Sequence, residues 1–174
     1  DPEHPGAYNL STHLPWIGMR TADPDGAHVE YARGISNPLG IKVGPGLAPS
    51  VLLDLVNILD PDRLPGRLTL ITRFGVDHIE SSLPPLIEAM RADGRKVLWS
   101  CDPMHGNTET VPSGLKTRRF ENILSEMELA FDIHQANQSA LGGVHLELTG
   151  ENVTECTGGA RGLQDDDLGK AYTS

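Results

Sequence analysis

The chain has 174 residues, about the length of one domain, and its 38% hydrophobic content is enough for a core. Its formal net charge of −10 argues against a general nucleic-acid binder, which needs a basic face, so no nucleic-acid partner is expected. No apolar run approaches the roughly 20 residues of a membrane span and no leader resembles a signal peptide, so the sequence predicts a cytoplasmic protein with no membrane partner.

The first half of the chain alternates short apolar runs with segments of helical pattern. After an irregular leader, each apolar run is bounded by glycine or proline, which favours short strands. The longest helical segment repeats leucine and valine at a spacing that makes one face apolar. The predicted elements are a leader at 1–10, a strand at 14–21, one or two helical turns at 25–36, a strand at 39–43, a helix at 49–60 and a strand at 68–72.

The second half continues the alternation. Pro84 and Pro85 are expected in the first turn of a helix, where a missing N–H is tolerated. A strand near 97–99 then runs into the polar groups Cys101, Asp102 and His105. The predicted elements are a helix at 83–91, that strand, a helix at 117–137 with a buried stripe of Phe120, Ile123, Leu124, Met127, Phe131 and His134, a strand at 144–148 and a loop-rich tail at 158–174.

Strands that alternate with helices of this length predict right-handed crossovers and a parallel sheet in an α/β fold. The intervals between Lys42, Arg73, His105 and Glu147 are each the size of one strand–helix unit. Four or five such units do not close a (β/α)8 TIM barrel, which takes about 250 residues. The chain is therefore predicted to be part of such a barrel, and a small open sheet is the alternative.

Polar side chains follow the predicted strands. Because the carboxyl ends of parallel strands meet at one rim, Arg20, Lys42, Arg73, His105 and Glu147 are expected to converge there. Three cations held together favour a small polyanion that carries phosphate or carboxylate groups. For any one of these cations, an ordinary surface or ion-paired role remains the alternative.

A second basic group is predicted where the long helix starts. Lys116, Arg118 and Arg119 would lie at the end of the helix where the macrodipole disfavours positive charge. A bound phosphate would remove that conflict, because helix N-termini and basic side chains both favour anions. A solvated basic turn explains the pattern equally well.

His105 and Glu147 are candidate ligands for a divalent metal ion. Imidazole and carboxylate groups suit Mn, Fe, Co or Zn, although protein sites normally supply three or four ligands. His145 alternates with Glu147 on the predicted strand and would face the same side. A purely structural histidine is the alternative at position 105.

Six motifs resemble those of the type II (plant-type) 3-deoxy-D-arabino-heptulosonate 7-phosphate (DAHP) synthases, and the resemblance extends over about residues 11–172. The most specific blocks are CDPMHGNT and TGENVTEC. The full runs are WIGMRT at 16–21, NPLGIKVGP at 37–45, PGRLTLITRFG at 65–75, WSCDPMHGNT at 99–108, GLKTRRF at 114–120 and GGVHLELTGENVTEC at 142–156.

The resemblance implies a (β/α)8 barrel of which residues 1–174 supply about strands four to eight. It implies a transferase that condenses phosphoenolpyruvate with erythrose 4-phosphate to give DAHP and phosphate, the first step of the shikimate pathway to aromatic amino acids.

The resemblance also assigns roles to residues of this chain. Arg20, Lys42 and Arg73 would bind phosphoenolpyruvate, and Lys116 would belong to the loop that receives erythrose 4-phosphate. Lys42, Arg73 and His105 would be catalytic. His105 and Glu147 would bind a divalent metal such as Mn or Co, which would act as a Lewis acid.

The sequence departs from the family pattern at several points. A cysteine ligand, an arginine and an aspartate ligand expected from other parts of the barrel are not in this chain, and Met19 stands where the family usually has an acidic residue. The isolated 174-residue chain is therefore expected to be inactive, as a part of a synthase or as a half-barrel that forms a homo-oligomer or pairs with the missing half. A non-catalytic anion-binding or regulatory relative is the alternative.

Overall fold

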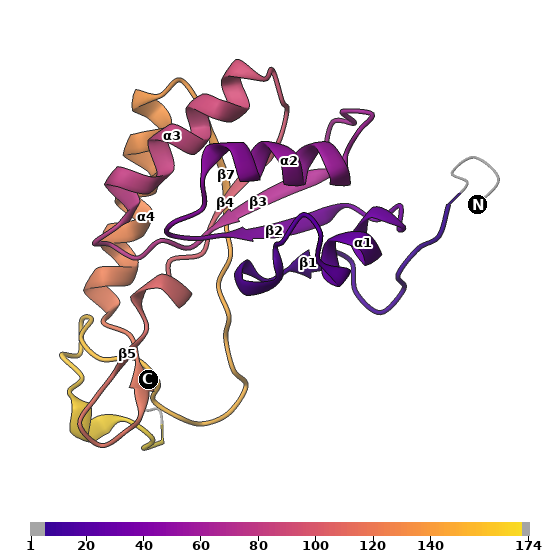
Figure 1. Cartoon of the computed structure of the whole chain (residues 1–174). Helices are drawn as coiled ribbons and strands as arrows, with labels where there is room; N and C mark the ends of the chain where they lie inside the picture. The colour runs from indigo at the N-terminus through magenta and orange to yellow at the C-terminus, as the bar shows by residue number, and fades with distance from the viewer. Residues whose placement is uncertain (1–5, 172–174) are drawn as a thin grey trace.

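A five-stranded parallel sheet forms the centre of the computed structural model, which describes residues 6–171 (Figure 1). Strands β2 and β3 occupy the residues predicted from the sequence, and β4 extends the predicted strand to Cys101. The spatial order of the strands is β1-β2-β3-β4-β7, which is also their order along the chain. The strands are β1 (Trp16–Ile17), β2 (Leu39–Val43), β3 (Leu68–Thr72), β4 (Leu98–Cys101) and β7 (Leu141–Val144).

One helix connects each strand to the next, and α2, α3 and α4 lie along one side of the sheet (Figure 1). An order that never reverses, with each helix packed on the next, is the arrangement of a singly wound βα fold. The sheet is open at β1 and β7, and it is compatible with part of a (β/α) barrel. The helices are α1 (Ala27–Arg33), α2 (Pro49–Leu59), α3 (Ile79–Ala92) and α4 (Phe120–Ala136).

The apolar core lies between the sheet and these helices. Alternate residues of a strand point to opposite faces, and Ile41 and Leu70 on the helix side are fully buried among the apolar faces of α2 and α3. On the opposite face, Trp16 and Leu98 are 48% and 49% exposed. The two faces of the sheet therefore differ in burial, and the face covered by the helices forms the core.

Helix α3 is longer than predicted, because Pro84 and Pro85 lie in its interior rather than in its first turn. Each proline removes one backbone hydrogen bond from the helix. The helix continues through them because it buries an apolar stripe that includes Ile79, Leu83 and Met90. Tertiary packing thus overrides the local penalty.

Helix α4 begins at Phe120 rather than at position 117, and its predicted buried stripe is wrong in part. Phe120, Leu124 and Phe131 are 47%, 40% and 60% exposed. The helix instead packs through a different face, which includes Glu126, because backbone amides of the protein donate hydrogen bonds to this buried carboxylate. That face consists of Ile123, Glu126, Ala130 and His134.

Strand β7 ends at Val144, so the strand predicted at 144–148 is misplaced. A Cβ atom on Gly142 would lie 2.2 Å from Cδ1 of Leu98, so a larger residue at this position would displace the Leu98 side chain. His145 and Glu147 therefore follow the strand instead of alternating within it. The amide of His145 still donates to the Cys101 carbonyl at 2.7 Å, which holds the segment against β4.

A small lobe below the carboxyl end of the sheet contains the antiparallel pair β5 (Glu109–Thr110) and β6 (Lys116–Thr117) together with the C-terminal segment (Figure 1). Thr117 is buried there and donates from Oγ1 to the Glu155 carbonyl at 2.9 Å. The predicted tail includes the short helix η3 (Asp165–Asp167), and its last residues, 172–174, like residues 1–5 of the predicted leader, lie outside the described part. Within residues 6–171, no helix has both the length and the apolar character needed to cross a membrane.

Candidate active site

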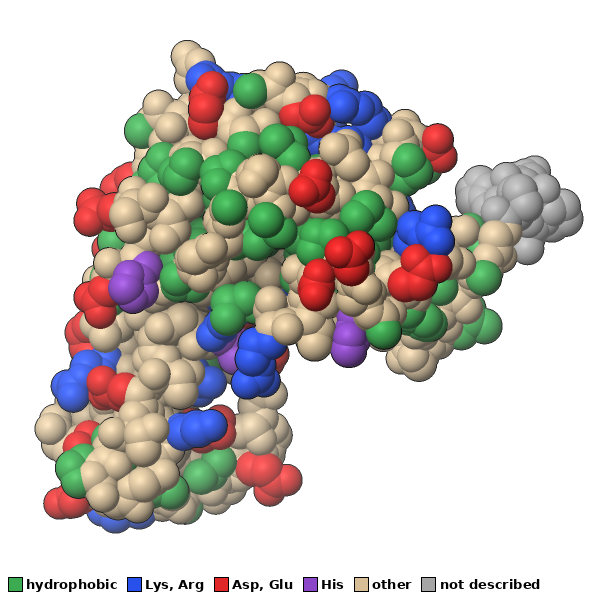
Figure 2. All heavy atoms as spheres, viewed as in Figure 1, with side chains coloured by type: hydrophobic (Ala, Val, Ile, Leu, Met, Phe, Trp, Pro, Cys, Tyr) green, Lys and Arg blue, Asp and Glu red, His purple; other side chains and the backbone are tan. Residues whose placement is uncertain are grey.

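A cavity of about 620 Å³ lies at the carboxyl ends of the strands. Figure 2 shows a hollow between the sheet-bearing part of the molecule and the small lobe, with Lys and Arg side chains gathered at it. The strand ends and the β5–β6 hairpin thus deliver the predicted side chains to one place. All six residues singled out from the sequence line this cavity: Arg20, Lys42, Arg73, His105, Lys116 and Glu147.

The segments that follow the strands position these groups. Lys42 is the fourth residue of β2, whereas Arg73 comes directly after β3. Arg20 lies in the 3-10 turn η1 (Met19–Thr21) after β1, and His105 begins the 3-10 turn η2 (His105–Asn107) after β4. The parallel strands therefore bring together residues that are more than 100 positions apart in sequence.

Arg73 presents hydrogen-bond donors to the cavity. Its Nη2 donates to the backbone carbonyl of His105 at 2.8 Å, and its Nη1 lies 3.1 Å from the Met19 sulfur, a weak acceptor. Its Nε is buried and has no hydrogen-bond partner among residues 6–171. A buried guanidinium nitrogen without an acceptor is costly, and a carboxylate or phosphate oxygen would satisfy it.

Asp102 joins Lys42 to His105. Its carboxylate is fully buried, accepts from the Lys42 ammonium and lies with Oδ2 2.7 Å from Nδ1 of His105. The amides of Met104 and His105 donate to its other oxygen at 3.1 Å each. Burial by itself raises the pKa of Asp102, but the hydrogen bonds from Lys42 and from the His105 amide outweigh it and lower the pKa below its usual value.

His105 and Glu147 form a pair suited to a metal ion. Nδ1 of His105 is engaged by Asp102, so Nε2 is the nitrogen that faces outward, and it lies 3.3 Å from Oε2 of Glu147. A carboxylate that orients a ligating imidazole is a recurrent feature of metal sites. His105 and Glu147 fit part of a metal site. They do not complete one, because the described chain has no cluster of three or more side chains that could bind a metal ion.

His145 and Trp16 close one side of this pair. Nε2 of His145 lies 3.6 Å from Oε1 of Glu147, and its ring meets the Trp16 ring edge-on with centroids 5.2 Å apart. Trp16 also lies under the Lys42 ammonium, 5.9 Å from the ring centroid. Trp16 therefore lies on the cavity wall.

The second basic group is only partly where the sequence predicted it. Lys116 lies in β6, four residues before α4, and is therefore not in the first turn of the helix. Arg118 lines the cavity and donates from Nε to the Met104 carbonyl at 2.9 Å, whereas Arg119 pairs with Glu109 at 3.0 Å. The predicted position of Lys116 at the start of the helix is wrong, but Lys116 and Arg118 both line the cavity.

The charge balance of the cavity is opposite to that of the whole chain. Among the described residues that line it are five cations, Arg20, Lys42, Arg73, Lys116 and Arg118, against the single carboxylate of Glu147. The chain as a whole carries −10. Guanidinium and ammonium groups concentrated in an otherwise acidic protein favour a small polyanionic ligand.

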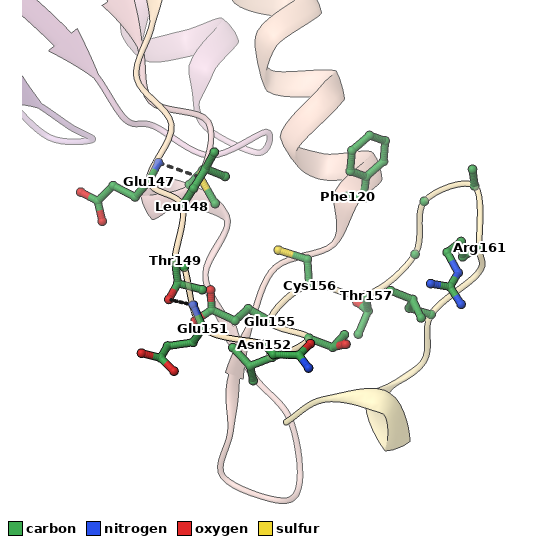
Figure 3. Close-up of a pocket in the computed structure, with 18 residues that line it drawn as sticks. Phe120, Glu147, Leu148, Thr149, Glu151, Asn152, Glu155, Cys156, Thr157 and Arg161 are labelled. Atoms are coloured by element: carbon green, nitrogen blue, oxygen red, sulfur yellow. Dashed lines mark hydrogen bonds between the residues drawn. The ribbon is translucent and has the colours of Figure 1, made fainter. Parts of the chain in front are cut away.

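A second cavity of about 820 Å³ lies beside the first, against the segment 147–163 (Figure 3). Its described lining carries three carboxylates, Glu147, Glu151 and Glu155, and the cation Arg161. In Figure 3 the Glu147 side chain extends away from Phe120 and Cys156, which line the other side of this cavity. The larger cavity is therefore not suited to an anionic ligand, although it is the wider of the two.

Sequence reasoning missed two residues that organise the site, Asp102 and Glu126. Asp102 precedes His105 by three positions, a spacing at which its side chain can accept a hydrogen bond from the His105 amide. Glu126 gave a clearer signal, since a carboxylate interrupts the apolar face of a long helix. Its partners are described below.

Known proteins match this chain over almost all of its length. The model of the Class-II DAHP synthetase family matches residues 1–174. The phospho-2-dehydro-3-deoxyheptonate aldolase of Neurospora crassa is 53% identical over 169 residues, which cover 96% of this chain and 35% of the relative. The corresponding aldolase AroG of Mycolicibacterium smegmatis is 49% identical over 165 residues, which cover 95% and 36%.

The chain thus spans about one third of the length of these relatives. The match includes every segment that lines the cationic cavity, because it extends over the whole sequence. The chain belongs to the Class-II DAHP synthetase family.

Proposed function

We propose that this chain supplies the substrate-binding strand ends of a metal-dependent DAHP synthase. The reaction would condense phosphoenolpyruvate with erythrose 4-phosphate and water to give DAHP and phosphate. A carbon–carbon bond would form between the methylene carbon of phosphoenolpyruvate and the aldehyde carbon of the sugar phosphate. The observation that carries this proposal is the single cavity in which Lys42, Arg73, His105 and Glu147 meet.

The cations of the cavity would bind and orient the two phosphorylated substrates. Arg73, Arg20 and Lys42 line the cavity together and can contact phosphate or carboxylate oxygens of phosphoenolpyruvate. Lys116 comes from the separate β5–β6 hairpin, so it would bind the second phosphate, that of erythrose 4-phosphate. Concentrated positive charge reduces the repulsion between the two anions and holds the reacting carbons together.

Lys42 and Asp102 would hold a proton near the reacting atoms. The ammonium group is buried and hydrogen-bonded to the Asp102 carboxylate, whose lowered pKa favours the ionised form. Asp102 also keeps the Nδ1 side of His105 occupied, which leaves Nε2 directed at Glu147.

His105 and Glu147 would hold a divalent metal such as Mn or Co, with further ligands from outside the described residues. Such a metal supplies Lewis acidity toward a carbonyl oxygen. We propose accordingly that the five-stranded sheet forms about strands four to eight of a closed (β/α)8 barrel in a cytoplasmic enzyme. The remaining strands would come from another part of the same polypeptide or from a partner chain, because the relatives are about three times as long.

An assay of phosphoenolpyruvate consumption and phosphate release tests the proposal. The full-length protein, assayed with erythrose 4-phosphate and Mn²⁺, should consume phosphoenolpyruvate, and His105→Ala should abolish both turnover and Mn²⁺ binding. His28→Ala, which changes an exposed histidine on α1, is the matched control and should leave both unchanged. Turnover with bound metal in His105→Ala would exclude the ligand role of His105, and a wild-type protein without turnover would contradict the proposed reaction.

A non-catalytic anion-binding relative is the second candidate, and one contact favours it. Met19, rather than the acidic residue usual in the family, lies against Nη1 of Arg73. The two candidates differ in one combination of results. Tight phosphoenolpyruvate binding without phosphate release, in the presence of Mn²⁺ and erythrose 4-phosphate, would select the binding protein.

A further inference from the structure

Glu126 of α4 is a fully buried carboxylate outside the cavity lining. Its Oε1 accepts hydrogen bonds from the amides of Phe74 and Gly75, at 2.9 and 3.0 Å. Its Oε2 accepts from Nδ2 of Asn107 at 2.7 Å. All three partners are donors, which favours the ionised form, although burial raises the pKa of this carboxyl.

Asn107 continues the contact to a second segment. Its Oδ1 accepts from the amide of Val76 at 3.0 Å, and its Nδ2 also donates to the carbonyl of Pro103 at 2.7 Å. Glu126 and Asn107 together therefore bond to residues 74–76, which follow β3, and to residue 103, which follows β4. Every one of these bonds is local to the carboxyl ends of two neighbouring strands.

The two segments that this pair joins lie in direct contact. A Cβ atom on Gly106 would lie 2.2 Å from the Gly75 nitrogen, and Gly75 has a φ of +81°, so neither position accepts a larger residue without movement. The segment after β3 carries Arg73, the segment after β4 carries His105, and Nη2 of Arg73 bonds to the His105 carbonyl. Any shift between the segments therefore changes the distance between these two side chains.

We propose that Glu126, acting through Asn107, is a positioning residue that fixes the spacing between the anion-binding Arg73 and the metal-binding His105. This inference rests on the function proposed above, in which Arg73 and His105 contact different ligands. Glu126 itself touches neither ligand. It sets the relative position of the two loops, because one carboxylate accepts donors from both.

The chemistry of the contact distinguishes positioning from simple packing. An apolar residue at position 126 would suit the face of α4 formed by Ile123 and Ala130 but would leave the amides of Phe74 and Gly75 buried without an acceptor. A carboxylate satisfies these amides and reaches Asn107 at the same time. A packing role alone would affect the stability of the protein, whereas a positioning role must also affect the affinities of the two ligands.

The test is Glu126→Gln in the full-length protein, with phosphoenolpyruvate and Mn²⁺ binding measured separately by calorimetry. Glutamine has nearly the same volume, but its NH2 group would face either the Asn107 amide or the two backbone donors. We expect both affinities to fall by about tenfold, the lower range for loss of an outer contact at a metal site. A parallel loss for two ligands that bind at different groups is the signature of a changed spacing.

The matched control is His134→Gln, which changes another buried side chain of the same helix, beside Trp99 and away from both loops. It should lower the melting temperature and leave both affinities within about twofold of wild type, a change of less than 0.5 kcal/mol. If Glu126→Gln does not fold, Asn107→Ser takes its place, because serine is too short to reach both Glu126 and Val76. The same parallel loss is expected for it.

The outcomes separate this inference from the proposed function. If the wild-type protein binds both ligands and the folded variant, Glu126→Gln or Asn107→Ser, binds them with unchanged affinities, the positioning role is overturned and the proposed function stays intact. A wild-type protein that binds neither phosphoenolpyruvate nor Mn²⁺ would overturn the proposed function and the inference that rests on it. A parallel loss of affinity for phosphoenolpyruvate and Mn²⁺ in Glu126→Gln or Asn107→Ser, but not in His134→Gln, supports both the proposed function and the positioning role.

Discussion

The two ends of the parallel sheet use arginines in opposite ways. At the amino end of β4, Arg95 has a side chain that is 1% exposed and donates to the Asp60 carbonyl at 2.6 Å, to Asn57 and to Asp93 at 3.3 Å. Arg63 bonds to the same Asp93, so the cations and carboxylates there satisfy one another. At the carboxyl end of β3, Arg73 has a carbonyl and a sulfur as partners and one buried nitrogen without any in the described chain.

The difference teaches that burial of an arginine does not by itself indicate a binding site. Arg67, near the amino end, also has a nitrogen without a partner among the described residues, yet its other nitrogens bond to backbone carbonyls and its charge interacts with Asp60. At Arg73 the unpartnered nitrogen coincides with a cavity and with four other cations. The combination, rather than any one feature, marks the carboxyl end as functional and the amino end as structural.

The largest effect is expected when the amino end is broken. Arg95→Ala leaves the buried carboxylate of Asp60, 3% exposed, without its cation, and removal of one partner of a buried pair costs about 3–5 kcal/mol. Chemical unfolding should show that loss, while the KM for phosphoenolpyruvate of the folded fraction stays unchanged. An altered KM with unchanged stability would reverse the roles assigned to the two ends.

The next effect belongs to the carboxyl end. Arg73→Ala should weaken phosphoenolpyruvate binding by about 100-fold, since loss of a charged hydrogen-bond partner costs 2 kcal/mol or more. Stability should change far less than in Arg95→Ala, because the contacts of Arg73 within the chain are few. Calorimetric titration with phosphoenolpyruvate and an unfolding curve on the same preparation measure both quantities. An equal loss of stability and affinity would indicate a structural arginine.

A smaller effect is expected at the link between the two ligand sites. Asp102→Asn removes the charge that Lys42 contacts and weakens the bond that orients the His105 ring. Mn²⁺ affinity should fall by about tenfold, as for other carboxylates behind a metal-bound histidine. Asp54→Asn, an exposed carboxylate on α2, is the matched control. Unchanged Mn²⁺ affinity in Asp102→Asn would show that the ring is oriented by other contacts.

The smallest effect concerns pH and lies away from both ends. Burial lowers the pKa of His134 to about 4, below the value of about 6.5 for an unfolded chain. The unfolded chain therefore binds a proton first as the pH falls, so this histidine contributes stability above pH 6.5 that is lost progressively between about pH 6.5 and 4. Melting temperatures at pH 7.5 and 5 should drop further in wild type than in His134→Gln. Equal drops would place the pH dependence elsewhere.

The sequence by itself predicted the β2 and β3 strands, the alternation with helices and the convergence of five side chains, Arg20, Lys42, Arg73, His105 and Glu147, on one cavity. These features are local or periodic: apolar runs between glycine and proline residues define the strands, and parallel strands place their carboxyl ends together. The motifs also sufficed for the family, which the comparisons confirm.

The tertiary structure decided what local pattern could not. It placed α4 with Glu126 inward and Phe131 outward, because the backbone amides of Phe74 and Gly75, which follow β3, donate hydrogen bonds to Glu126. It ended β7 at Val144, so His145 and Glu147 follow the strand instead of alternating within it. It also placed the Asp102 carboxylate within hydrogen-bond distance of both Lys42 and His105. Each of these outcomes depends on atoms that are distant in sequence, so side-chain direction and partner choice were fixed only when the strands packed together.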